Sequence, residues 1–144
     1  ELTSVPLTSD PYVLICRDDH PLAKRRRIRW EALQPHPLIF AGEVSGNRSL
    51  LEGALKSSGV MLHSFYEVQR SSTALGLVAE GLGAAVVPRL AIQKNAYPMI
   101  RTIELVEPQV SRTLVLVTRR VAQLSPAARA LYEMIVEEGA TLAR

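Results

Sequence analysis

The stretch from Ser71 to Leu90, SSTALGLVAEGLGAAVVPRL, decides the fold that the sequence predicts. Its first half carries apolar residues at three- and four-residue spacing, which predicts a helix that begins at Ser71. Gly81 and Gly83 end this helix, because glycine adopts backbone conformations closed to other residues. The apolar run 84–87 predicts a short strand covered on both faces. A helix that leads so directly into a buried strand is typical of a parallel α/β sheet.

Three small hydroxyl residues, Ser71, Ser72 and Thr73, open the predicted helix. Their side chains can cap the helix by accepting hydrogen bonds from the unpaired N–H groups of the first turn. Alternatively, the same groups contact a small molecule, and the positive end of the helix dipole favours an anion there. The residues alone leave these two alternatives open.

Several further strands are predicted on either side of this stretch. Short apolar runs predict buried strands, a β-branched run near the carboxyl end predicts a central strand, and partial alternation at the start predicts an edge strand ended by Asp10-Pro11. A half-buried strand is expected around Ile103 and Leu105. The other runs are Glu1–Thr8, Tyr12–Cys16, Leu38–Phe40, Ser64–Val68 and Thr113–Thr118.

Helices are predicted between these strands. Asn47 is placed to cap a helix through Ser58, with Gly59 as its stop. Ser125-Pro126 is a typical helix start, because the serine hydroxyl caps and proline suits the first helical position. The apolar stripe of that last helix is expected to be Ala127, Leu131, Met134 and Ile135. Shorter helical turns are expected at 30–33, where Trp30 and Leu33 pack onto the core, and within 89–95.

The composition fits a globular domain with no covalent cross-link. The chain has 144 residues, a formal net charge of +3 and a single cysteine, Cys16, which lies in an apolar run. One cysteine excludes an internal disulfide and agrees with a reducing cytosol. No apolar run is long enough to span a bilayer and no signal peptide is evident, so we expect a cytoplasmic protein that does not contact membranes.

A basic run, Lys24 to Arg29, allows two interpretations. It could contact phosphate groups or DNA, or it could be a solvated turn that leads into the short helix at Trp30. The solvated turn is favoured, because nucleic-acid surfaces usually draw basic residues from elsewhere in the chain as well.

The sequence shows little sign of catalytic or metal chemistry. The three histidines, at 20, 36 and 63, lack the spacing of metal ligands. Neither a phosphate-binding glycine loop, nor a dinucleotide fingerprint, nor a nucleophile elbow is complete. We therefore expect no metal, no cofactor and no enzymatic activity.

A binding site is better supported, at the carboxyl ends of two predicted parallel strands. One strand end is Phe40-Ala41-Gly42, and the other is Gln69-Arg70, which leads into the hydroxyl residues 71–73. In open α/β sheets, ligands bind beyond such strand ends and beside helix starts. Arg70 could add a charge-assisted hydrogen bond to an anion, although a solvent-facing arginine is the commoner outcome.

Three segments, in order, resemble the effector-sensing domain of LysR-type transcriptional regulators. They are YVLICRDDHPLA at Tyr12–Ala23, TALGLVAEGLGAAVVP at Thr73–Pro88, and RTLVLVTRRVAQLSPAARALYEMI at Arg112–Ile135. The resemblance implies a fold similar to periplasmic binding proteins, in which two α/β lobes with central, mostly parallel sheets hold an effector in a cleft. It implies a crossing strand at 1–11, the second lobe at 12–117, and a return to an incomplete first lobe at 118–144.

The resemblance also implies roles for particular residues. Ala41, Gly42, Ser71 and Ser72 would face the cleft, and Thr118 would lie near the hinge. The partners implied are a small effector, further copies of the chain in a dimer or tetramer, and DNA through a helix-turn-helix domain upstream. Nothing in the chain corresponds to that domain or to the early part of the first lobe, so we expect this chain alone to bind an effector weakly or not at all. The alternative is a solute-binding protein of the same architecture.

Overall fold

The computed structural model describes residues 1–42, 46–119 and 123–142. It contains two compact units, one formed by Glu1–Asp10 with Ser111–Arg144 and the other by Pro11–Val110. The units divide after Asp10 and after Val110, whereas the lobes expected from the sequence divide after residues 11 and 117. The assignment of lobes stays a prediction, and each unit is described by itself.

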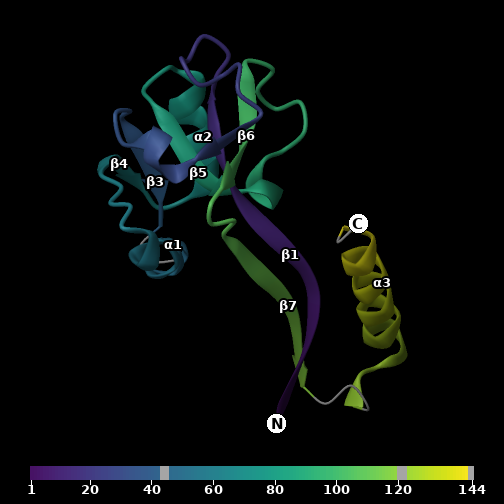
Figure 1. Ribbon diagram of the computed structural model, residues 1–144. Coiled ribbons are helices and arrows are strands. Elements are labelled where there is room, and N and C mark those ends of the chain that lie inside the picture. Colours follow the sequence, from purple (N-terminus) through teal and green to yellow (C-terminus); the bar gives the residue numbers. More distant parts are fainter. Residues whose placement is uncertain (43–45, 120–122, 143–144) are drawn as a thin grey trace. The chain divides into compact units, whose positions relative to one another are not determined.

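The unit Pro11–Val110 is built on a mixed sheet with mostly parallel pairs. Its strands lie in the order β2-β6-β1-β5-β3-β4 (Figure 1). β3 runs parallel to β4 and β5, and β2 runs parallel to β6, while β1 is antiparallel to β5 and β6. The strands are β1 Leu2–Arg17, β2 Arg27–Arg29, β3 Leu38–Ala41, β4 Ser64–Val68, β5 Ala84–Pro88 and β6 Ile100–Val106.

Side chains alternate between two apolar cores, one on each face of this sheet. In β3, Leu38 and Phe40 join one core, and Ile39 joins the other. Helix α1, Asn47–Leu55, packs on the Phe40 face, and helix α2, Ser71–Ala79, packs on the Ile39 face. This two-sided burial explains why the strand sequences are continuously apolar rather than alternating.

Most elements of this unit agree with the sequence predictions. β3, β4 and β5 and the start of α2 lie within one residue of their expected positions. Ile103 and Leu105 of β6 are fully buried, as are Trp30 and Leu33 in the 3₁₀ turn Trp30–Leu33. The indole N–H of Trp30 donates to the Pro108 carbonyl at 2.7 Å. A second 3₁₀ turn, Arg89–Ala91, occupies part of 89–95.

The prediction that Asp10-Pro11 ends the first strand is wrong. β1 continues from Leu2 to Arg17 through both residues. Its pairing with β5 begins at Tyr12 and its pairing with β6 begins at Val13, so the missing N–H of Pro11 costs neither ladder a hydrogen bond.

Two details around α1 also differ from prediction. The residue before its first turn is Gly46, with φ at +71°, and no side chain that the structure describes caps the helix. Asn47 instead accepts a hydrogen bond from the Tyr12 hydroxyl at 2.7 Å, which ties α1 to β1. The helix ends at Leu55 and a 3₁₀ turn, Lys56–Ser58, leads to Gly59, whose φ of +69° confirms it as the stop.

The unit Glu1–Asp10 with Ser111–Arg144 holds the first part of β1, strand β7 (Ser111–Arg119) and helix α3 (Pro126–Leu142). β7 pairs with β1 and with no other described strand, and its residues alternate between exposed and half-buried, so the prediction of a central strand is wrong. Local β-propensity does not reveal how many neighbours a strand has. The buried carboxylate of Asp10 accepts from Arg112 Nε at 3.0 Å.

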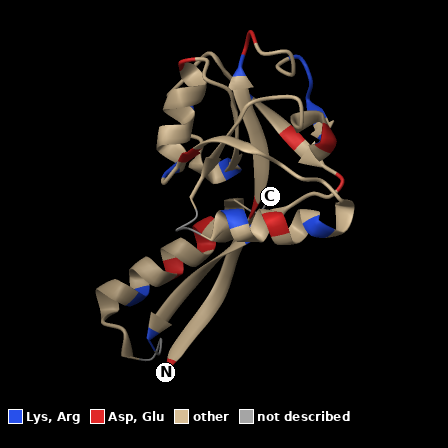
Figure 2. Cartoon of the chain, turned by 90° about the vertical axis from the view of Figure 1, so that its left-hand side faces the viewer, with Lys and Arg blue, Asp and Glu red and all other residues tan. Residues whose placement is uncertain are grey.

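Helix α3 begins where predicted but turns a different face inward. The Ser125 hydroxyl accepts a hydrogen bond from the Ala128 N–H at 3.3 Å, which confirms the predicted cap. Leu131 and Met134 are 57% and 66% exposed, so the predicted apolar stripe is wrong at these positions. Gly139 is the buried residue, with Leu7 of β1 so close that it leaves no room for a Cβ. The charged residues of α3 are spread along its length (Figure 2).

Candidate functional site

The two predicted strand ends meet at one edge of the sheet. β3 and β4 are parallel neighbours, and Ala41 lies opposite Val68 in their register. Just beyond, the N–H of Gly42 donates to the Val68 carbonyl at 2.7 Å. The carboxyl ends of parallel strands share an edge, so segments 40–42 and 69–73 are brought together as their sequence positions suggested.

The start of α2 leaves backbone donors available. Arg70 precedes the helix in an extended conformation, with φ −128° and ψ 142°. Its carbonyl accepts the first two bonds of the helix, from Thr73 N at 3.1 Å and Ala74 N at 3.2 Å. The N–H groups of Ser71 and Ser72 come before the first helical bond and have no carbonyl one turn earlier. They are the groups that an anion would bind.

The hydroxyls at this helix start do not cap it. Arg70 occupies the capping position, and no side-chain cap hydrogen bond forms. Ser71 is half-buried, while Ser72 and Thr73 are exposed. Within the part of the chain that the structure describes, none of the three hydroxyls forms a hydrogen bond. The capping alternative is thereby rejected for this structure, and the hydroxyls remain available to a ligand.

The remaining predicted site residues lie in different surroundings. Gln69 is exposed beside the helix start, whereas Ala41 and Gly42 are buried and offer mainly backbone. Phe40 is 7% exposed and points into the core on the α1 face, away from α2. Thr118 belongs to the other unit, where its hydroxyl lies 3.1 Å from that of Thr3. A hinge role for Thr118 stays a prediction.

Electrostatics at the site come from Arg70. Its side chain is exposed and pairs with no acidic group among residues 1–42, 46–119 and 123–142. By contrast, Arg27 and Arg29 of the basic run are engaged, Arg27 with Glu104 at 3.1 Å and Arg29 with Glu107. These two ion pairs support the interpretation of the basic run as a solvated surface.

Titratable groups elsewhere give no catalytic arrangement. Burial raises the pKa of the Cys16 thiol from 9.0 to about 11, so this cysteine is a poor nucleophile. Burial, followed by the charge of His36, lowers the pKa of His20, whose ring lies 4.9 Å from that of His36. No group of three or more metal-binding side chains occurs among the described residues.

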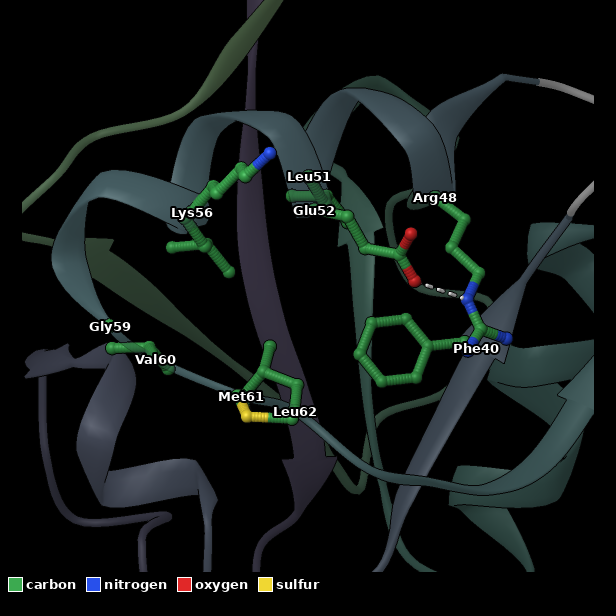
Figure 3. Close-up of a pocket in the computed structure, with 10 residues that line it drawn as sticks. Phe40, Arg48, Leu51, Glu52, Lys56, Gly59, Val60, Met61 and Leu62 are labelled. Atoms are coloured by element: carbon green, nitrogen blue, oxygen red, sulfur yellow. Dashed lines mark hydrogen bonds and ion pairs between the residues drawn. The ribbon is translucent and has the colours of Figure 1, made fainter.

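Sequence reasoning missed a cavity on the α1 face of the same sheet. It has a volume of about 510 Å³ and lies between α1, the segment after Gly59, and Phe40 (Figure 3). Phe40 was expected at the effector-binding strand end, and no cavity was predicted between it and Leu51 and Leu55. The space between them depends on the path of the chain after Gly59, which no residue pattern reveals.

No helix among the described residues is long and apolar enough to cross a membrane.

Comparison with known proteins identifies the family of the chain. The family model of the LysR substrate binding domain matches residues 1–140. The chain is 44% identical over 131 residues to an uncharacterized HTH-type transcriptional regulator, YbhD, of Escherichia coli, covering 91% of this chain and 41% of YbhD. It is 30% identical to the RuBisCO operon transcriptional regulator of Allochromatium vinosum, covering 99% of this chain and 47% of the relative. It thus spans somewhat less than half the length of these relatives.

Solved structures share the fold. The regulatory domain of CcmR from Synechocystis, in complex with 2-PG, has a TM-score of 0.79 at 21% identity and is matched over 96% of this chain and 67% of that one. The effector binding domain of QuiR in complex with shikimate also has a TM-score of 0.79, at 24% identity over 97% and 66%. The likeness confirms the predicted α/β fold of periplasmic-binding-protein type. The chain belongs to the LysR substrate-binding domain family.

Proposed function

We propose that this chain is the effector-sensing portion of a cytoplasmic LysR-type transcriptional regulator, and that it binds a small anionic molecule without transforming it. The observation that carries the proposal is the convergence of two strand ends, at Ala41 and Val68, beside a helix start with free donors. Family membership supports effector binding as the role of this site.

The expected ligand chemistry follows from the groups at that edge. The N–H groups and hydroxyls of Ser71 and Ser72 offer neutral donors, and the helix start adds about half a positive charge. The guanidinium of Arg70, which pairs with no acidic group of the described residues, adds a full charge within the same segment. A carboxylate uses all three kinds of donor, because each of its oxygens accepts more than one hydrogen bond. Shikimate, the ligand named for QuiR, is a carboxylate.

Regulation would follow from a difference in affinity between two arrangements of the protein. An effector that binds one arrangement more tightly shifts the population toward it and can thereby alter how DNA-bound subunits assemble. We propose that the DNA contact is made by a helix-turn-helix domain, as the names of the relatives suggest, in a homo-oligomer. The relatives are regulators, so no observation favours the alternative of a solute-binding protein.

The test introduces a negative charge at the helix start. A panel of small carboxylates, with shikimate included, is screened by thermal shift against the complete effector-binding domain. The carboxylate that stabilises it most is then titrated against Ser72→Asp, which should abolish the shift because the new carboxylate repels the ligand. At a ligand concentration 100 times its Kd, the shift lost corresponds to about 2.7 kcal/mol.

Ser57→Asp is the matched control, because Ser57 is also exposed but lies in the 3₁₀ turn after α1. It should leave the titration unchanged. An unchanged titration in Ser72→Asp would remove the helix start from the site.

A further inference from the structure

The cavity on the α1 face has the size of a small-molecule site. Its volume of about 510 Å³ falls within the range of about 300–1,000 Å³ typical of ligand pockets. One wall is α1, and the opposite wall is the segment 59–62, which belongs to no helix or strand. Figure 3 shows the Phe40 ring directed into the space between them. The cavity lies entirely within the unit Pro11–Val110.

The interior of this cavity is apolar. Its deep residues, Phe40, Leu51, Leu55 and Val60, are each less than 10% exposed, whereas Met61 at the mouth is 69% exposed. A wall of this kind gains from contact with hydrocarbon, at about 25 cal/mol for each Å² of apolar surface removed from water. The body of a ligand in this cavity must therefore be apolar.

Among the described residues at the rim of the cavity, Arg48 is paired with acidic groups and Lys56 is not. Arg48 donates to Glu52 at 2.8 Å and pairs with Glu67, which also accepts from the Ser64 hydroxyl at 2.8 Å. The Ser64 hydroxyl and then Arg48 lower the pKa of the Glu67 carboxyl. Lys56 lines the same cavity and pairs with no acidic group of the described residues. The Lys56 ammonium can therefore pair with a negatively charged group of a ligand.

This cavity is distinct from the proposed effector site. Phe40 and α1 belong to the core on one face of the sheet, and Ala74, Leu75 and Val78 of α2 belong to the core on the other. Binding in this cavity does not depend on the proposed function.

We propose that the cavity between α1 and residues 59–62 binds an amphipathic monocarboxylate, with its hydrocarbon chain against Phe40 and Leu55 and its carboxylate at Lys56. The long, flexible stem of lysine lets the ammonium follow the head group at the mouth. The occupant is a small molecule rather than a protein segment, because the apolar wall is recessed beneath a charged rim.

The methionine methyl groups give a direct readout. The chain has three methionines, and only Met61 lines the cavity, while Met99 and Met134 lie elsewhere. The whole 144-residue chain, labelled with ¹³C at the methionine methyls, is titrated with decanoate, decan-1-ol and decyltrimethylammonium below their micelle concentrations. Decanoate should shift the Met61 signal saturably and leave Met99 and Met134 in place.

Head-group chemistry is tested with Lys56→Gln, with Lys94→Gln as its matched control at an exposed lysine outside the cavity. Lys56→Gln should weaken decanoate binding by up to about fivefold, the upper end of the range for one exposed ion pair, and should leave decan-1-ol binding unchanged. Val60→Phe should block both ligands. If that variant fails to fold, the Lys56→Gln titration still tests whether the carboxylate lies at Lys56.

Four results would overturn the proposal: a Met61 signal that ignores decanoate, equal shifts at all three methionines, binding of decyltrimethylammonium as tight as that of decanoate, or a Met61 shift that follows protein concentration alone. The last would mean that a second copy of the chain covers the cavity. Ser72→Asp should not change decanoate binding, so failure here and failure of the effector site are distinguishable.

Discussion

At the scale of single residues, Cys16 shows how position fixes chemistry. It lies in β1 between strands β5 and β6 and is completely buried. Burial penalises the thiolate, because a charge loses its hydration in an apolar core. The pKa of the thiol therefore rises to about 11.

The raised pKa predicts a loss of stability in alkali. The folded thiol keeps its proton up to about pH 11, whereas the unfolded thiol loses it near pH 9.0, so the unfolded state binds fewer protons between these values. The free energy of unfolding should fall across this window by about 3 kcal/mol, since one pKa unit corresponds to about 1.4 kcal/mol. Urea titrations at stepwise pH measure this fall. Cys16→Ala should remove most of it, and an equally steep fall in that variant would assign it to other groups.

Two glycines offer a matched test of close packing. At Gly83, with φ at +154°, a Cβ would lie 2.6 Å from the Pro37 carbonyl oxygen, whereas at Gly53 in α1 a Cβ would meet nothing within 4 Å. Gly83→Ala should destabilise the protein by about 1–3 kcal/mol, because the backbone at Pro37 must shift. Gly53→Ala should be neutral or stabilising by up to about 1 kcal/mol, since alanine favours helix. Chemical denaturation of both variants checks the contrast, and similar losses in both would contradict it.

At the scale of elements, side-chain bonds fix α1 to the sheet. The Tyr12 hydroxyl, on a side chain 1% exposed, donates to Asn47 at the start of the helix. Arg48 links the next position of α1 to Glu67 of β4. These bonds hold the helix that forms one wall of the apolar cavity.

Removing the Tyr12 hydroxyl tests this tie. Tyr12→Phe should lower the free energy of unfolding by about 1–2 kcal/mol, because Asn47 loses its partner within a part-buried site. Amide hydrogen exchange should accelerate in the first turn of α1 and stay unchanged in α2. Equal acceleration in both helices would show a general loss of stability instead of a local tie.

The elements also show what sequence can and cannot predict. β3, β4, β5 and α2 were predictable, because apolar runs and flanking glycines or prolines state their limits locally. β2 was missed, since only Ile28 is apolar between Arg27 and Arg29, and its pairing with β6 involves residues distant in sequence. The prediction of which face of α3 packs inward was wrong, because that face is determined by the close approach of Gly139 to Leu7.

Some features of the candidate site were likewise predictable from the sequence, and others were not. Convergence of residues 40–42 with 69–73 was predictable, because it follows from parallel neighbours and their carboxyl ends. The direction of the Phe40 side chain was not predictable, because it depends on strand register. Neither was the available state of the Ser71–Thr73 hydroxyls, since Arg70 rather than a serine holds the capping position.

At the scale of the whole molecule, exposed apolar side chains predict self-association. Val115 and Val117 on β7 are 48% and 51% exposed, and Phe65 on β4 is 69% exposed. Apolar surface of this kind tends to be covered by a partner. Sedimentation velocity should show a mass that rises with concentration, and Val115→Lys with Val117→Lys should lower it. A monomer at every concentration would contradict this prediction.

The central claim is that a small carboxylate binds where β3 and β4 end and α2 begins. It is tested most directly by an amide NMR titration of the complete effector-binding domain with the carboxylate that stabilises it most. Saturable shifts are expected at the amides of Gly42, Ser71, Ser72 and Thr73 at one common Kd. Saturable binding that leaves these four amides unmoved would contradict it.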